Sequence, residues 1–456
     1  MDRYELIITN GTVVTPQGER KLDIAVSGGK IAAMAQTPAG FEGKETVDAR
    51  GLLVLPGGVD AHVHFEDPGM TDWEDWEHGS LAAAAGGITT VADMPVDNIP
   101  PTTDAQTLLL KKAAALERSN VDFALWGGLT AGAKPEEMLD GGAAGLKAFL
   151  AECGGPYFPV ADSGTLYEGM KAAASRGKPV TVHCEDAEAV DYYTRQCLEA
   201  PPFDNGSWSR SRPVLAELLA VNKVMFLAGL TGARVNVAHI SSPEVADLIA
   251  QGRAGGIDVT AETCAHYLYF DGGDVLRRGT ALKCSPPIRP DEKTALWECV
   301  KDGRISTVAS DHSPTSMELR ELYADDMYRG SGGISGVQFT LNVLYSEGVK
   351  KHGLSLERLT EVFSSNAARA LGLYGRKGAV AEGFDADLVL FDPAAVWTVD
   401  RADYLAKVKY SPYIGETFTG RVRATYVRGQ RVYCQGEQPR TRTHFAQMLE
   451  PENAEI

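Results

Sequence analysis

The central part of the chain alternates between short apolar segments and longer stretches that are typical of helices, such as 103–118 and 214–228. This alternation favours parallel βαβ units. The candidate strands are 53–63, 88–94, 121–127, 144–150, 179–184, 234–240, 257–263 and 304–310. Eight strands with helical crossovers predict a closed (β/α)8 barrel, the TIM-barrel type of α/β fold. A doubly wound open sheet is the alternative, but no GxGxxG motif follows an early strand.

The two ends of the chain have a different pattern of apolar and polar residues from the centre. Residues 1 to about 55 form short alternating segments separated by turn signals, and the segments 386–391 and 424–429 resume this style. Each end alone has too few strands to be stable by itself. We therefore expect a small β-sandwich built from residues 1–55 and 376–456, with residues 56–375 forming the barrel.

Composition narrows the class of protein. The chain has 456 residues and a net charge of -17, so an acidic surface disfavours nucleic acid and anionic membranes as partners. The first residues contain no signal-peptide pattern, and the apolar stretches are expected to be too short to span a membrane. The seven cysteines include no CxxC pair, which favours free thiols in a reducing cytoplasm. We expect a cytoplasmic protein.

Several polar residues lie at or near the predicted carboxyl ends of barrel strands. His62 and His64 are two positions apart on one strand, so both rings point the same way and can reach one metal ion. An HxH pair alone is a weak signal, because two solvated or hydrogen-bonded histidines would look the same. His183, His239 and Asp311, however, follow three further strands. In barrel enzymes this end of the strands carries the active site, so their convergence favours a metal centre.

Lys147 interrupts an otherwise apolar strand, where a charged amine is costly to bury. One interpretation is a lysine that extends to the barrel rim or pairs with a carboxylate. The other is a lysine carbamate formed with CO2, an anion whose two oxygens can bridge two cations. The second interpretation explains why a lysine accompanies histidines and an aspartate.

The motifs together resemble those of the cyclic amidohydrolases, the family that contains dihydroorotase, hydantoinase (dihydropyrimidinase) and allantoinase. The resemblance covers nearly the whole chain, and its segments are 55–64, 145–149, 182–185, 239–242 and 310–312. It implies a catalytic barrel with two divalent metal ions, most simply zinc, with manganese, cobalt or nickel as alternatives. One metal would be held by His62, His64 and Asp311, the other by His183 and His239. Carboxylated Lys147 and a hydroxide would bridge them.

The same resemblance assigns further expected properties. Asp311 would take the proton from the attacking hydroxide and pass it to the leaving nitrogen. Family members are usually homo-oligomers, so we expect a dimer or a tetramer. The substrate class is a cyclic ureide, a small molecule.

Pocket residues distinguish the members of the family. Dihydroorotases usually carry an arginine where this chain has Glu66, and hydantoinases usually carry a tyrosine where it has Glu152. The run 147–154 and the segments 262–267, 283–289, 332–338 and 410–415 resemble the allantoinase group instead. That group opens the ring of allantoin to give allantoate, and the resemblance implies that backbone groups near Ser285 and Gly332 bind the ring amide. Cys153 is expected either to line the pocket or to be a small buried apolar residue.

Two alternatives remain open. The first is a hydantoinase or dihydropyrimidinase that acts on related cyclic ureides, because it would share every metal ligand. The second is a non-catalytic scaffold protein, although such relatives have typically lost metal ligands that this chain keeps.

Overall fold

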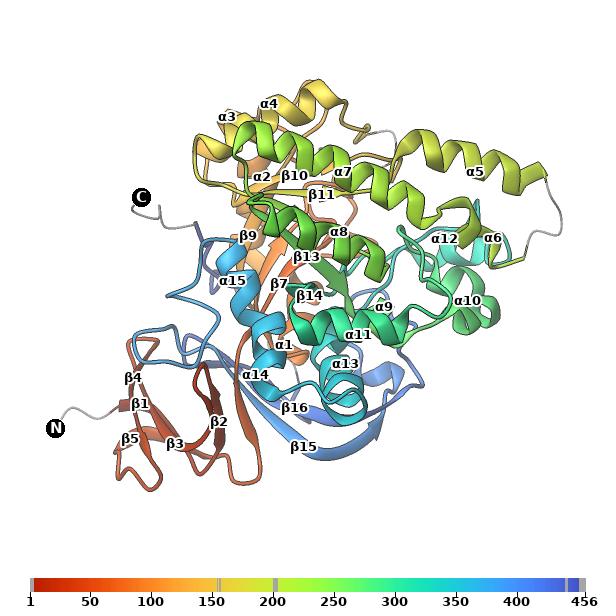
Figure 1. Cartoon of the computed structure of the whole chain (residues 1–456). Coiled ribbons are helices and arrows are strands. Elements are labelled where there is room, and N and C mark those ends of the chain that lie inside the picture. Colours follow the sequence, from red (N-terminus) through yellow and green to blue (C-terminus); the bar gives the residue numbers. More distant parts are fainter. Residues whose placement is uncertain (1–3, 154, 156, 200–203, 439–441, 451–456) are drawn as a thin grey trace.

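The computed structural model describes residues 4–153, 155, 157–199, 204–438 and 442–450. Its centre is an eight-stranded parallel sheet in the order β14-β13-β12-β11-β10-β9-β8-β7 (Figure 1). The strands are β7 (Gly58–Val63), β8 (Ile88–Asp93), β9 (Asp122–Gly128), β10 (Gly145–Phe149), β11 (Val180–His183), β12 (Val235–Val237), β13 (Val259–Cys264) and β14 (Thr307–Ala309). All but one of their residues are buried, as both faces of a parallel sheet covered by helices require.

Helices connect successive strands on the outside of the barrel. Those between β7 and β12 are α1 (Trp76–Ala85), α2 (Ala105–Arg118), α3 (Pro135–Asp140), α4 (Ser163–Ala174), α5 (Ala187–Glu199), α6 (Ser207–Ser211) and α7 (Val214–Thr231). Those after β12 are α8 (Pro243–Ala254), α9 (Ala265–Tyr269), α10 (Gly272–Arg278), α11 (Lys293–Asp302), α12 (Met317–Leu322), α13 (Thr340–Val343), α14 (Leu356–Thr360) and α15 (Asn366–Ala370).

The sheet closes where its last strand returns to its first. His312, just beyond β14, pairs in parallel with Val63 of β7, and the His64 amide donates to the His312 carbonyl at 2.8 Å. The Asp60 carboxylate accepts the Ser310 amide across the same seam at 3.2 Å. The predicted (β/α)8 barrel is therefore confirmed, and its closure brings residues 62–64 beside residues 310–312.

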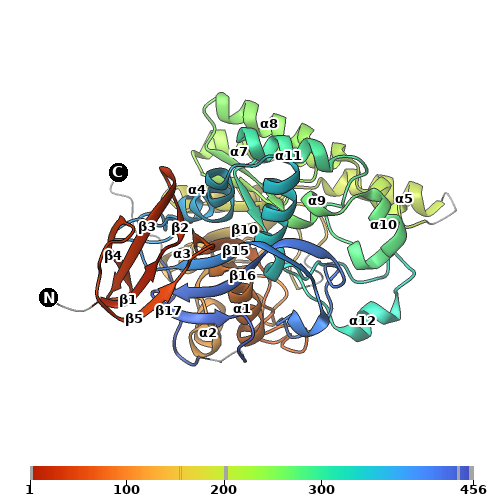
Figure 2. The ribbon, with the colours of Figure 1, turned by 90° about the horizontal axis from the view of Figure 1, so that it is seen from below.

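Both ends of the chain contribute to a second, nine-stranded sheet. Its strands are β1 (Tyr4–Thr9), β2 (Thr12–Thr15), β3 (Gly18–Ser27), β4 (Lys30–Gln36), β5 (Gly43–Asp48), β6 (Leu53–Pro56), β15 (Leu388–Thr398), β16 (Thr417–Val427) and β17 (Gln430–Cys434). β6 joins the two contributions, because it pairs in parallel with β2 and antiparallel with β15. Figure 2 shows β15–β17 lying beside the N-terminal strands. The expected union of the two ends is confirmed.

The single strand expected over residues 53–63 is wrong in one respect, because the chain changes sheets within it. The Gly57 amide donates to the Asp387 carbonyl of the terminal sheet at 2.8 Å, whereas the Gly58 amide donates to Gly87 of the barrel. A Cβ on Gly57 would lie 2.1 Å from the Thr89 hydroxyl oxygen. Only glycine therefore allows the two sheets to approach so closely at this crossing.

A buried ionic cluster fixes the barrel to the terminal sheet. The Lys377 amine lies 2.7 Å from Asp122 at the start of β9, 2.8 Å from Asp387 and 3.1 Å from Asp385. Its side chain is 1% exposed. Because several carboxylates compensate one desolvated amine, each element of the junction depends on the others.

The expectation that no segment is long and apolar enough to span a membrane is wrong for one helical stretch, Ser207–Thr231. By length and composition alone it could cross a bilayer. Within it, α7 packs one face onto the barrel through Ala216, Ala220 and Val224. This half-buried packing is that of a barrel helix.

Candidate metal centre

The candidate ligands of the first metal position meet at one carboxylate oxygen. His62 Nε2 lies 3.2 Å and His64 Nε2 3.4 Å from the same Oδ1 of Asp311. Strand periodicity turns both rings toward the barrel mouth, and the closing seam places Asp311 opposite them. These donor atoms all lie within 4.8 Å of one another. A nitrogen–nitrogen–oxygen set of this kind suits zinc and similar divalent ions.

The other candidates complete the same cluster. His183 Nδ1 lies 3.0 Å from His239 Nε2, and the His239 ring centroid lies 5.3 Å from that of His62. Lys147 Nζ is 3.5 Å from His62 Nε2 and fully buried. Burial lowers the pKa of this lysine, which favours its neutral amine. The structure thus brings together all six candidate ligands that the sequence singles out.

Carboxylates behind the histidines fix which ring nitrogen faces the centre. His62 Nδ1 lies 2.8 Å from Glu262 Oε1, and His64 Nδ1 lies 3.0 Å from Asp97 Oδ2. His183 is turned the other way, with Nε2 2.9 Å from Glu185. A carboxylate that accepts one ring N–H leaves the other nitrogen free to bind a metal. The ligating atoms would therefore be Nε2 in His62 and Nδ1 in His183, and the ion-pair contact with Asp97 favours Nε2 in His64.

Glu185 is itself held ionised by a neighbouring cation. Burial alone would raise the pKa of its carboxyl group, but Arg212 and His183 outweigh that effect and bring the pKa to about 2. Arg212 Nη1 lies 2.7 Å from the carboxylate, and both side chains are buried. The His183 ring is therefore oriented by an acceptor that is ionised at neutral pH.

The backbone is strained at two of the candidate ligands. His239 has φ 39° and Asp311 has φ 46°, both in the left-handed region that non-glycine residues rarely adopt. Such conformations cost about 1–3 kcal/mol each and persist mainly where function requires them. Each lies two residues after the end of a short strand, β12 or β14, so the strained backbone turns its side chain into the cluster.

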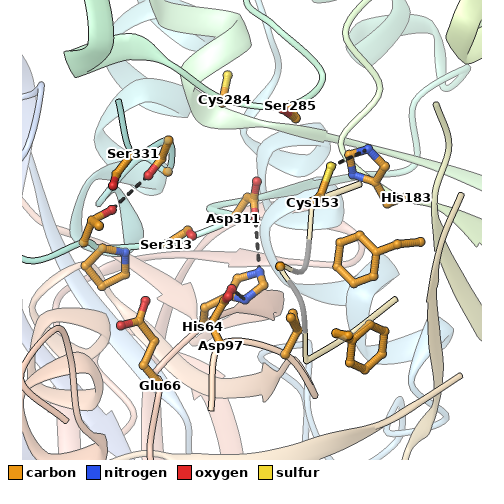
Figure 3. A pocket seen from close by; sticks show the side chains of 18 of the residues that line it. His64, Glu66, Asp97, Cys153, His183, Cys284, Ser285, Asp311, Ser313 and Ser331 are labelled. Carbon is orange, nitrogen blue, oxygen red and sulfur yellow. Dashed lines mark hydrogen bonds and ion pairs between the residues drawn. The ribbon is translucent and has the colours of Figure 1, made fainter. Parts of the chain in front are cut away.

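A cavity of about 500 Å³ opens onto the cluster (Figure 3). Cys153, Ser285 and Gly332, the expected substrate-binding residues, all line it. The Cys153 thiol lies 3.4 Å from His183 Nε2, so of its two expected positions the pocket wall is the one observed. The structure brings each of these residues to the mouth of the metal cluster.

Sequence reasoning missed the residues that support the ligands. Glu262 and Asp97 come from other βα units than the histidines they orient, so no sequence spacing links the partners. Glu185 could have been found, because it lies two positions after His183. Glu66, at the position where dihydroorotases usually carry an arginine, lines the cavity as expected of a pocket residue, and burial raises the pKa of its carboxyl group well above the usual value. The pocket therefore contains an acid whose neutral form is favoured.

Comparisons with known proteins agree with this geometry. The family model of the amidohydrolase family matches residues 53–432. The chain is 44% identical over 436 residues to the allantoinase of Rubrobacter xylanophilus, with 95% of each chain covered. It is 41% identical over 447 residues to the allantoinase of Deinococcus radiodurans, covering 95% of this chain and 96% of the relative.

Solved structures with the same fold are also similar. The L-hydantoinase (dihydropyrimidinase) from Arthrobacter aurescens superposes with a TM-score of 0.94 at 34% identity, covering 98% of this chain and 99% of the other. A dihydropyrimidinase from Brevibacillus agri superposes with a TM-score of 0.87 at 28% identity, covering 98% of each chain.

Proposed function

The chain belongs to the amidohydrolase family, and from that premise we propose that it hydrolyses the ring amide of allantoin to give allantoate. The observation that supports this proposal most directly is the complete ligand cluster at the mouth of a substrate-sized cavity. Several allantoinases at 38–44% identity over nearly the whole chain support allantoin as the substrate. A non-catalytic scaffold role fits poorly with a cluster that retains every candidate ligand.

We propose that the cluster holds two divalent cations, most simply zinc, with manganese, cobalt or nickel as alternatives. His62, His64 and Asp311 would hold one ion, and His183 and His239 the other. Lys147, carboxylated by CO2, would bridge them; its favoured neutral amine is the form that reacts with CO2. Paired cations of this kind lower the pKa of a shared water and polarise the substrate carbonyl.

The residues of the chain itself supply the proton transfer and the orientation. Asp311 would take a proton from the attacking water and deliver it to the leaving ring nitrogen, because its carboxylate lies at the centre of the cluster. Backbone groups at Ser285 and Gly332 would hydrogen-bond the ring amide, and Cys153 would contact the substrate beside His183. Such polar contacts to the ring edge discriminate one cyclic amide from another.

The competing substrate class is that of the hydantoinases, because several structural relatives carry that name. Ring opening of allantoin, hydantoin and dihydrouracil by the purified protein, supplied with divalent metal and bicarbonate, separates the two. We expect a strong preference for allantoin, with Asp311→Asn as the inactive control. A preference for hydantoin or dihydrouracil would instead assign the protein to the hydantoinases or dihydropyrimidinases. Absence of all three activities in metal-loaded protein would contradict both substrate assignments.

We also propose a cytoplasmic homo-oligomer, a dimer or a tetramer. Leu215, Leu219, Phe226 and Leu230 lie on one face of α7 and are 44–66% exposed. An apolar stripe of this size favours burial against a second copy of the chain. Light scattering of the wild type and of Phe226→Asp tests the proposal: we expect the variant to dissociate, and a monomeric wild type would contradict it.

A further inference from the structure

A second cavity lies at the opposite end of the barrel from the metal cluster. It has a volume of about 410 Å³ and opens among the amino-terminal ends of β11 to β14, beneath α14 and α15. Its lining residues are Pro179, Arg234, Val235, Asn236, Arg253, Asp258, Thr260, Gly303, Ser306, Thr307, Arg358, Asn366, Arg369 and Ala370. Nothing in the proposed hydrolysis uses it.

The charge of this cavity is opposite to that of the molecule. Four arginines line it, and Asp258 is the one acidic residue among the described lining residues. The whole chain, by contrast, carries a net charge of -17. Burial and the neighbouring Arg358 both lower the pKa of Arg253. Like charges held this close destabilise the fold unless an anion compensates them.

Backbone carbonyls, rather than carboxylates, hold several of these guanidinium groups in place. Arg253 Nε donates to the Val259 carbonyl at 3.1 Å, and Arg358 donates to the carbonyls of Val300 and Ile305 at 2.8 and 2.7 Å. Of the four, Arg358 also pairs with a partly exposed carboxylate, Glu361, at 2.8 Å. Carbonyl acceptors fix the direction of an arginine without neutralising it. The charge of Arg253 is therefore not neutralised by these contacts, whereas that of Arg358 is partly compensated by Glu361.

Arg234 adds a further donor in the wall of the cavity. Its Nη2 donates to the Gly177 carbonyl at 2.9 Å, but its Nε is buried and has no hydrogen-bond partner among the described residues. A buried donor without an acceptor destabilises the fold. The hydroxyl groups of Thr260 and Ser306 lie in the same wall. Fixed guanidinium groups together with hydroxyls are the donors that proteins use for phosphate and carboxylate groups.

We propose that this cavity binds a small metabolite that carries a doubly charged oxyanion, either a phosphate group or a pair of carboxylates. The site lies at the far end of the barrel and does not depend on the identity of the ring that the metal cluster opens. A ligand here would compensate the paired arginines and fill the gap between α8, α14 and the ends of the strands.

The test uses metal-loaded full-length protein at low salt, titrated by calorimetry with sulfate, phosphate and malonate. Sulfate is the main probe, because it is a tetrahedral dianion that binds metal ions weakly. We expect one saturable site per chain. Tighter binding of sulfate and phosphate would identify a phosphate-type ligand, and tighter binding of malonate a dicarboxylate. Absence of saturable binding by all three anions would overturn the proposal.

A matched pair of variants assigns the binding to this cavity. Ala370 lines it, so Ala370→Glu introduces a carboxylate and Ala370→Gln an uncharged side chain of the same size. We expect the dissociation constant of the glutamate variant to exceed that of the glutamine variant by about tenfold or more. The glutamate variant should also unfold at the higher temperature. Equal anion affinities for the two variants would overturn the proposal.

Arg369→Gln provides a third variant that does not fill the cavity. Arg369 contacts Asn366 at 3.1 Å and stacks on Tyr374, both near the surface, so its removal should leave the fold intact. We expect it to weaken sulfate binding roughly tenfold, the value of one charged hydrogen bond. Arg304→Gln serves as its control, because Arg304 pairs with Asp247 and Asp302 outside the cavity. Equal losses in these two variants would also contradict the assignment.

Discussion

Glu262→Gln tests whether the carboxylates behind the histidines set the affinity of the metal centre. Glu262 is 1% exposed, and its Oε1 lies 2.8 Å from His62 Nδ1. Its Oε2 accepts from Asn236 Nδ2 at 3.3 Å. Glutamine keeps the size of the side chain but removes its charge. It also sets an amide N–H against either the Asn236 amide or the His62 ring N–H.

The expected size of the effect follows from these contacts. Loss of an acceptor behind a ligating histidine weakens metal binding by about 10–100-fold. In free energy this corresponds to about 1.4–2.7 kcal/mol. His62 is one of six candidate ligands in the cluster, so the other five remain in the variant. We therefore expect weaker metal binding with the fold retained. Competition with a chromophoric chelator measures the affinity, and circular dichroism checks the fold. Ring opening should recover as the metal concentration is raised.

Glu74→Gln is the matched control. Glu74 is a buried carboxylate 3.2 Å from His312 Nε2, and the other nitrogen of that ring faces the Val337 amide. His312 therefore presents no free nitrogen to the cluster, although it follows Asp311 directly. If Glu262→Gln retained metal as tightly as Glu74→Gln does, the reasoning that assigns His62 its orientation from Glu262 would be refuted.

Three further predictions concern other parts of the molecule. Lys147→Ala should lose the tightly bound metals and nearly all turnover, because the bridging anion is gone; elemental analysis showing two metals with near-normal activity would contradict this. Lys377→Met should lower the free energy of unfolding in urea by about 3–5 kcal/mol, since it leaves buried carboxylates uncompensated. Lys171→Met, at an exposed ion pair with Glu168, should change it little. The hydrogen bond with Asp75 raises the pKa of His78 above 6.5 in the folded protein. The charged ring therefore stabilises the fold fully below pH 6.5. This stabilisation is lost as the pH rises through the higher pKa of the folded state. The difference in Tm between the wild type and His78→Gln should therefore shrink from about pH 6 to about pH 9, and a constant difference would argue against the pair.

The barrel could be predicted from the sequence because its strands are short, apolar and separated by helices. Seven of the eight predicted strands agree with the structure to within a few residues, whereas 53–63 combined a strand of each sheet. Hydrophobic periodicity cannot reveal that division, because β6 and β7 are both fully buried. The chain changes sheets at Gly57, where Thr89 approaches the backbone closely, and this contact is visible only in the three-dimensional packing.

The candidate ligands were predictable for a different reason. Parallel strands end at one face of a barrel, so polar residues at several strand ends must converge there. The supporting groups obey no such rule. Asp97 and Glu262 reach their histidines through the folding of loops and of a neighbouring strand, and either could equally have been an ordinary buried carboxylate. The arginine-lined cavity was missed as well, because Arg234, Arg253 and Arg358 are widely separated in sequence.

The pairing of β6 with β15 has a consequence for the order of events during synthesis. The ribosome makes β1–β6 first, yet the strand that β6 pairs with follows the whole barrel. Until Leu388–Phe391 emerge, β6 presents an unpaired edge of apolar residues, which is a template for wrong association. Early protection of this edge by the nascent barrel or by a chaperone would therefore govern the yield of folded protein. A chain that stops before residue 388 would keep its ligands but leave that edge open.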